Sequence, residues 1–148
     1  VLLTGASRGI GAAAHGALAA AGLTVIGQST AGGNGLIAAD FAEPRSADAL
    51  WAQALERAGG RIDVLVNNAG VFEAADIADA DGFASAWARS LAINLQSAAD
   101  LCRHAVLHFQ QHGGGRIINV ASRAGHRGDS PKHWHYAAAK GGMLAMTK

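Results

Sequence analysis

The sequence lacks the features that mark several classes of protein. Cys102 is its one cysteine among 148 residues, so no internal disulfide can form, which suits a reducing compartment. The formal net charge is +1, without a run of like charges. Binding to nucleic acid or to a membrane surface therefore has no electrostatic support. No apolar run approaches the roughly 20 residues of a membrane span and no signal peptide is visible, so we expect a cytoplasmic protein.

Apolar residues and glycine are what the chain does contain. Half of its residues are hydrophobic, which is enough for one domain with a real core. Its 20 glycines cluster at expected turns, such as residues 32–35 and 113–115, instead of recurring with a fixed period. The chain begins inside a predicted strand and stops inside a predicted helix, so we expect an N-terminal fragment of a longer protein.

Short apolar segments alternate with helical patterns along the whole chain. They predict strands at 1–3, 23–27, 36–39, 62–66 and 117–120, and helices at 11–21, after an N-cap at Ser46, at 81–111 and from about 134 onward. This alternation predicts an α/β fold, a doubly wound parallel sheet with helices on both faces. The second and third strands are too close in sequence for a helical crossover, so we expect a bare loop between them.

A glycine-rich loop joins the first predicted strand to the first helix. Gly5, Gly9 and Gly11 let the backbone approach a pyrophosphate, and the helix N-terminus supplies unpaired N–H groups. A glycine loop without a ligand is the alternative, which the strand-to-helix context disfavours. Asn67 and Ser122 also follow strand ends, and in such sheets ligands bind beyond the carboxyl ends of the strands.

Tyr136 and Lys140 form the most informative pair. Residues four positions apart lie on one face of a helix, where an ammonium group favours the tyrosinate. A tyrosine tuned in this way exchanges a proton with an alcohol oxygen. Alone, the pair would be better explained as one face of an amphipathic helix. Asn94 and Ser122 elsewhere in the chain favour the catalytic interpretation.

Together, these motifs resemble the short-chain dehydrogenase/reductase family, in particular its 3-oxoacyl-thioester reductase branch. The motifs are T-G-x-x-x-G-x-G from Thr4, N-N-A-G from Asn67, Asn94, Ser122 and the Tyr136–Lys140 pair, in family order. The resemblance implies a Rossmann-type NAD(P)-binding domain over residues 1–148, incomplete at the C-terminus because later strands are missing. It also implies an oxidoreductase that transfers a hydride between a nicotinamide cofactor and a carbonyl or secondary alcohol. A non-catalytic dinucleotide-binding sensor and an inactive truncated fragment stay open as alternatives.

The resemblance also implies residue roles and assembly. Tyr136 would be the general acid or base, Lys140 would bind the nicotinamide ribose, Ser122 would hold the substrate oxygen and Asn94 would anchor a water. The implied cofactor-binding residues are Gly5, Ser7, Arg8, Gly9, Ile10, Gly11, Ser29, Asp40, Asn68, Ala69, Gly70, Tyr136 and Lys140. Family members are commonly dimers or tetramers, so a homo-oligomer that acts on a small-molecule substrate is expected.

Cofactor preference depends on the end of the second strand. NAD-selective sites usually carry a carboxylate there, whereas this chain reads Gly27-Gln28-Ser29-Thr30. Arg8, together with the hydroxyl of Ser29 or Thr30, suits a 2′-phosphate, so we expect NADP(H) to be preferred over NAD(H). A solvated surface charge is the alternative explanation for Arg8.

Histidines are frequent, and two groups of them need an interpretation. His126, His133 and His135 lie in one segment, but no cysteine or carboxylate pair completes a metal site, so we expect no metal and place this segment at the border of the substrate cleft. The remaining histidines fall in predicted helices, where we expect exposed positions: His15, His104, His108 and His112.

Overall fold

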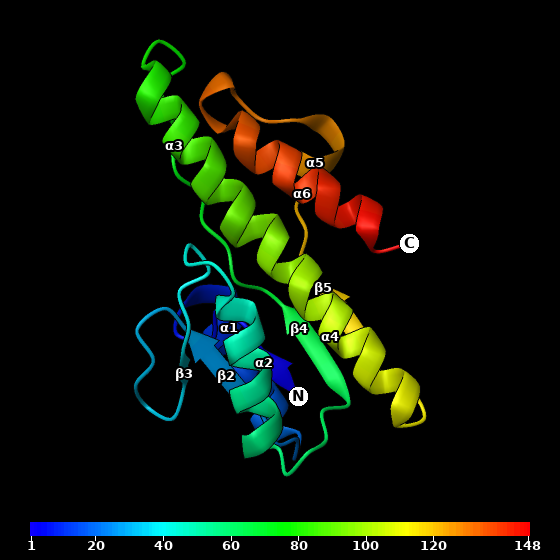
Figure 1. Cartoon of the computed structure of the whole chain (residues 1–148). Helices are drawn as coiled ribbons and strands as arrows, with labels where there is room; N and C mark the ends of the chain where they lie inside the picture. The colour runs from blue at the N-terminus through cyan, green and yellow to red at the C-terminus, as the bar shows by residue number, and fades with distance from the viewer.

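The computed structural model describes residues 1–148 as a parallel sheet with helices on both faces and a further group of helices beyond one end (Figure 1). The strands are β1 (Leu2–Leu3), β2 (Ile26–Ser29), β3 (Ile37–Ala38), β4 (Val64–Asn67) and β5 (Arg116–Asn119). The helices are α1 (Gly9–Ala20), α2 (Ser46–Arg57), α3 (Ala80–Leu91), α4 (Ser97–Gln111), α5 (Ala124–Arg127) and α6 (Trp134–Met146), with a π-helix η1 (Ala92–Gln96) and a 3₁₀ turn η2 (Pro131–His133). None of the helices combines the length and apolarity needed to cross a bilayer.

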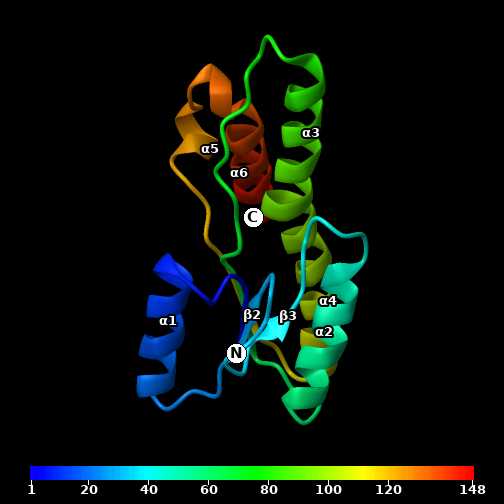
Figure 2. The same cartoon turned by 90° about the vertical axis from the view of Figure 1, so that its left-hand side faces the viewer.

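The sheet has the strand order β3-β2-β1-β4-β5, and all of its strand pairs are parallel. Strand addition changes direction after β3, so β1 and β4 are neighbours at the point where such sheets bind ligands. Helix α1 covers one face, while α2 and α4 cover the other (Figure 2). The predicted doubly wound parallel sheet is therefore confirmed, as is the bare loop between β2 and β3.

Several element boundaries differ from the sequence predictions, and two of them have a clear structural cause. β2 begins at Ile26 instead of residue 23, because the N–H of Leu23 donates to Leu18 O (3.1 Å) and so belongs to the end of α1. Ser46 is the first residue of α2 instead of its N-cap. Arg45 holds the cap position in a left-handed conformation (φ 62°) and makes no side-chain capping bond.

The core lies mainly between the sheet and the layer of α2 and α4. Its 14 buried residues include Leu2, Leu50, Leu65 and Leu101, each with no exposed surface. The opposite face of the sheet is thinner, and its small cluster contains Leu3. Adjacent residues of β1 thus serve opposite faces, as the pleat of a strand requires.

His108 corrects the expectation that the helical histidines are exposed. Its side chain is buried on α4, and Nε2 accepts a hydrogen bond from Ile62 N (3.2 Å) ahead of β4. Burial, followed by the neighbouring His112, lowers the pKa of this imidazole. The neutral ring supplies an acceptor for an N–H group that is otherwise buried, which explains its position inside.

Helices α3 and α4, joined through η1, form one rod along the length of the molecule (Figure 1). The sequence predicts this rod as a single helix over 81–111. Its upper half leaves the sheet and packs against α6, where Phe83 contacts Trp134 edge to face (6.5 Å between ring centroids). The apolar side chains on this half therefore cover α6 instead of the sheet.

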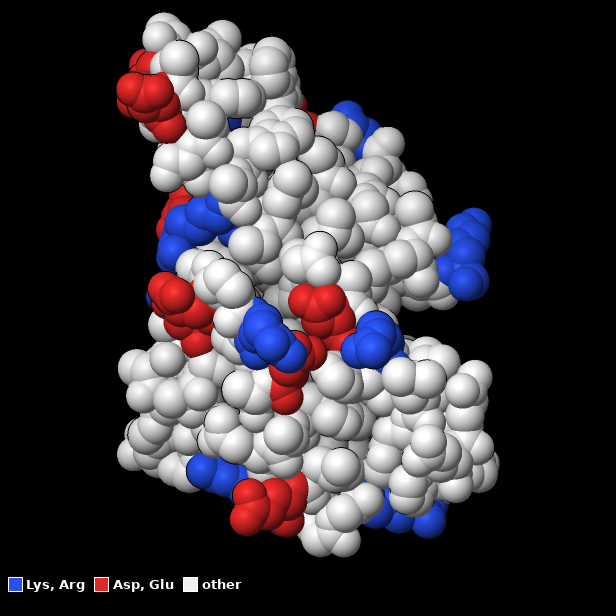
Figure 3. Space-filling model, in the orientation of Figure 1, with Lys and Arg blue, Asp and Glu red and all other residues white.

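Charges of both signs are interspersed on the face shown in Figure 3. Ion pairs such as Arg45–Asp48 (3.4 Å) and Arg89–Glu73 (3.3 Å) lie at the surface. Exposed pairs of this kind contribute little to stability, so burial of the apolar core is what holds the fold together.

Two alanine substitutions in α1 test the packing of this helix on the sheet. A Cβ at Gly11 would overlap Gly5 O, whereas a Cβ at Gly16 would have no neighbour within 4 Å. We expect Gly11→Ala to lower the free energy of unfolding by about 1–3 kcal/mol. Gly16→Ala should raise it by about 0.5–1 kcal/mol. Urea unfolding measures both, and a Gly11→Ala variant as stable as wild type would contradict this packing.

Candidate active site

Thr4 and Asn68 join the ends of β1 and β4. Thr4 Oγ1 accepts hydrogen bonds from Asn68 N and Ala69 N, each at 3.0 Å. In return, Asn68 Nδ2 donates to Thr4 O (2.9 Å) and Gly5 O (3.2 Å). The glycine loop is thus fixed to the segment after β4 by side-chain bonds in both directions.

The glycine loop is shaped for close approach by a ligand. Gly5 and Gly9 have positive φ values of 67° and 54°. A Cβ at Gly5 would lie 2.8 Å from Ala69 Cα, whereas Gly9 faces open space. Helix α1 has no side-chain cap and no acidic residue in its first turn. Its first N–H groups and its dipole are therefore available to an anion.

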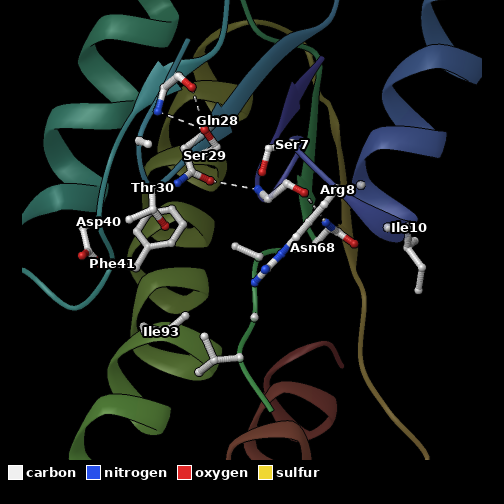
Figure 4. Close-up of a pocket in the computed structure, with 18 of the residues that line it drawn as sticks. Ser7, Arg8, Ile10, Gln28, Ser29, Thr30, Asp40, Phe41, Asn68 and Ile93 are labelled. Atoms are coloured by element: carbon white, nitrogen blue, oxygen red, sulfur yellow. Dashed lines mark hydrogen bonds between the residues drawn. The ribbon is translucent and has the colours of Figure 1, made fainter. Parts of the chain in front are cut away.

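A cavity of 690 Å³ lies beyond the ends of β1, β2 and β4 (Figure 4). The following predicted cofactor-binding residues line it: Gly5, Ser7, Arg8, Gly9, Ile10, Gly11, Ser29, Asp40, Asn68, Ala69 and Gly70. Tyr136 and Lys140 are outside its lining. The sequence analysis missed further lining residues, among them Gln28, Phe41, Val71, Arg89 and Ile93.

Gln28 is the missed residue with the clearest structural role. Its side chain is 2% exposed, and Oε1 accepts from Gly5 N (2.9 Å) while Nε2 donates to Ala39 O (2.6 Å). The amide therefore ties the glycine loop to the end of β3, just before Asp40. The sequence does contain a signal for this role, because Gln28 is a polar residue at the end of a buried strand.

At the end of β2, the cavity lining has one free hydroxyl group, although the sequence offers two candidates, Ser29 and Thr30. Ser29 Oγ accepts from Gly32 N (3.0 Å) and donates to Gly32 O (3.3 Å), so this hydroxyl closes the turn after β2. Thr30 is exposed beside it. Arg8 extends from the glycine loop into the cavity (Figure 4). Of the two predicted hydroxyls, that of Thr30 is the one left for a ligand.

Tyr136 and Lys140 lie on the face of α6 that turns toward the ends of β4 and β5. Lys140 is 4% exposed, its Nζ donates to Val120 O (2.8 Å), and it lies 5.9 Å from the centroid of the Tyr136 ring. Burial lowers the pKa of the Lys140 ammonium, because a low-dielectric environment disfavours the charged form. The tyrosine ring is half-buried.

Asn94 is fully buried in the π-helix η1, a conformation often found at functional sites. Its Oδ1 accepts from Val71 N (2.9 Å), and its Nδ2 donates to Val71 O (3.0 Å) and Ser90 Oγ (2.9 Å). A Cβ at Gly70 would lie 2.8 Å from Asn94 Oδ1 and 3.8 Å from Lys140 Nζ. Gly70 therefore links the cavity to both side chains.

Ser122 lies between β5 and α5, where its Oγ accepts from Ala124 N (3.1 Å). The same segment packs on α6, since a Cβ at Gly125 would lie 2.7 Å from the carbonyl carbon of Lys140. His135, placed by the sequence at the cleft border, is instead buried with no partner for either ring nitrogen. Burial, followed by His133, lowers its pKa.

Comparison with known proteins agrees with this geometry. The family model for short chain dehydrogenase matches residues 1–148, so the chain belongs to the short-chain dehydrogenase family. It is 36% identical to the short chain dehydrogenase ausX of Penicillium brasilianum, covering 100% of this chain and 60% of that protein. It is 35% identical to a 3-oxoacyl-acyl-carrier-protein reductase of Vibrio cholerae, covering 99% and 64% respectively.

A solved structure shows the same fold. It comes from a protein of Agrobacterium tumefaciens assigned as a gluconate dehydrogenase, with a TM-score of 0.82 and 28% identity. The alignment covers 99% of this chain and 62% of that one. The chain therefore spans less than two thirds of the length of these relatives.

Replacing Gln28 tests the bridge between the glycine loop and β3. We expect Gln28→Leu to lower the free energy of unfolding by about 1–3 kcal/mol, because Gly5 N and Ala39 O lose their partner. Gln53→Leu on the exposed side of α2 is the matched control and should stay within about 0.5 kcal/mol of wild type. Equal stability of the two variants in urea unfolding would rule out this role.

Proposed function

We propose that the protein is an NAD(P)-dependent oxidoreductase that interconverts a carbonyl group and a secondary alcohol. The observation that carries this proposal is the position of Gly70, which lines the cavity and approaches both Asn94 and Lys140. One site thus combines a cavity for a dinucleotide with a tyrosine and lysine for proton transfer. When bound, the nicotinamide cofactor supplies or accepts the hydride.

The cavity fits a dinucleotide at both of its ends. The uncapped N-terminus of α1 and the open side of Gly9 suit a pyrophosphate. Asp40 and Thr30 line the end that would receive the adenosine, and Gly70 lines the end nearest Lys140. Together with the other glycine-loop residues and Asn68–Gly70, these residues would hold the cofactor.

Tyr136 would donate a proton to the carbonyl oxygen in reduction and accept one in oxidation. The Lys140 ammonium has three N–H groups, and one of them donates to Val120 O (2.8 Å). A second donates to Met143 Sδ (3.8 Å), a weak acceptor that the ribose or a water at Asn94 would replace, and the third N–H group would serve the other of these two partners. Ser122 would hold the substrate oxygen opposite the tyrosine hydroxyl.

Three features support NADP(H) over NAD(H). No carboxylate ends β2, and Arg8 and Thr30 line the cavity with a guanidinium and a free hydroxyl. Asp40 Oδ1 already accepts a bond from Ala42 N (2.9 Å). A 2′-phosphate would thus meet a cation instead of an unpaired carboxylate.

The substrate class proposed is a 3-oxoacyl thioester. Its support is the 35% identity to the Vibrio reductase and 36% identity to a 3-oxoacyl-acyl-carrier-protein reductase of Synechocystis. We also propose a cytoplasmic homo-oligomer, dimer or tetramer. The exposed Val106 and Leu107 of α4 offer apolar surface for a second copy.

Tyr136→Phe tests the proton-transfer role. We expect turnover of the intact protein with NADPH and short 3-oxoacyl thioesters to fall by about 10²–10⁴-fold, since only the acid–base group is removed. Cofactor affinity, followed by fluorescence titration, should stay close to wild type. Retained turnover in the variant would refute the role, and tight cofactor binding without turnover in wild type would favour a sensor.

Arg8→Ala tests the cofactor preference. We expect it to weaken NADPH binding by about tenfold or more, the worth of one charge-assisted bond, and to weaken NADH binding much less. Arg103→Ala, an exposed arginine of α4 far along the chain, is the control and should alter neither affinity. Equal weakening of NADPH and NADH would remove the 2′-phosphate argument.

A further inference from the structure

Phe72 and His133 form a stacked pair next to Tyr136. Their ring centroids are 4.0 Å apart and their planes differ by 7°. The edge of the same pair meets the tyrosine, since the Phe72 and Tyr136 centroids are 4.9 Å apart at an interplanar angle of 77°. Edge-to-face contacts at the Phe72–Tyr136 distance are a favourable arrangement of aromatic rings.

Phe72 and His133 lie in two separate connecting segments, and a backbone hydrogen bond joins these segments. Phe72 precedes α3 and His133 ends η2, and between them Ala75 N donates to Lys132 O (2.9 Å). His133 is held on its other side, where Nδ1 lies 2.9 Å from Ser130 Oγ. The contact with Ser130 therefore fixes the orientation of the His133 ring independently of its stack on Phe72.

Phe72 is placed differently from a core residue. It is 58% exposed, so burial alone does not account for its position. Its ring contacts are with His133 and Tyr136. The tyrosine ring thus has an aromatic neighbour in addition to the ammonium of Lys140 (5.9 Å).

We propose that Phe72, oriented by its stack on His133, is a positioning residue that sets the ring of Tyr136 for proton transfer. This inference rests on the proposed function, because it assigns the hydroxyl of Tyr136 to the reacting oxygen. Displacement of a reacting group by about 1 Å can cost about 10²-fold in rate, so a ring that limits this displacement raises kcat. His133 acts through Phe72 and need not touch the substrate.

The kinetic test uses the intact protein with NADPH and a 3-oxoacyl thioester. Phe72→Leu should lower kcat by about threefold to tenfold, the worth of one aromatic pair, with cofactor Kd and melting temperature unchanged. Phe72→Tyr keeps the ring and should restore kcat. Ile77→Ala, another exposed apolar side chain of the same connection, is the control and should leave kcat unchanged.

A double substitution separates positioning from local packing. His133→Ala should lower kcat as Phe72→Leu does, and His133→Phe, which keeps the stack, should restore it. The variant with both Phe72→Leu and His133→Ala should be no slower than the slower single variant, because the two rings act as one unit. Multiplied losses, or a wild-type kcat in Phe72→Leu, would overturn the proposal.

A spectroscopic readout keeps this test independent of turnover. Tyr136 is the single tyrosine of residues 1–148. The NMR signal of its isotope-labelled ring can therefore be assigned as the one that is lost in Tyr136→Phe. His133→Ala should shift this signal although His133 acts through Phe72, and Ile77→Ala should not. An unshifted signal would defeat the positioning role, whereas a shifted signal in an inactive wild-type protein would defeat the proposed function alone.

Discussion

The hydrogen bonds between Thr4 and Asn68 are the constraint on which the site depends. β1 contributes two residues to the sheet, so strand pairing alone leaves the glycine loop weakly held. Thr4 Oγ1 receives two backbone N–H groups from the end of β4, and Asn68 Nδ2 returns bonds to Thr4 and Gly5. These bonds set the distance between the N-terminus of α1 and the segment that leads to Asn94.

The segment after β4, which leads to Asn94, also links the cavity to α6. Gly70 is small enough to let Asn94 and Lys140 approach, and the Asn94 amide holds the backbone of Val71 from inside the rod of α3 and α4. That rod packs against α6 and so fixes the helix that carries Tyr136. Cofactor cavity and proton-transfer residues are therefore parts of one connected structure.

Local signals in the sequence predicted much of this arrangement. Strand-to-helix context located the glycine loop, and helical spacing placed Tyr136 and Lys140 on one face of α6. The bonding roles of Gln28 and Thr4 were not predicted, because they depend on backbone groups distant in the chain. His108 was misplaced for the same reason, since its partner is the N–H of Ile62. Periodicity reports which face is apolar and carries no information on such pairings.

A structure of the intact protein crystallised with NADPH would test the central claim most directly. The account predicts a dinucleotide with its pyrophosphate at the N-terminus of α1, its 2′-phosphate beside Arg8 and Thr30, and its nicotinamide ribose within hydrogen-bond reach of Lys140 Nζ. A cofactor bound elsewhere, or one whose nicotinamide points away from Lys140 and Tyr136, would contradict it.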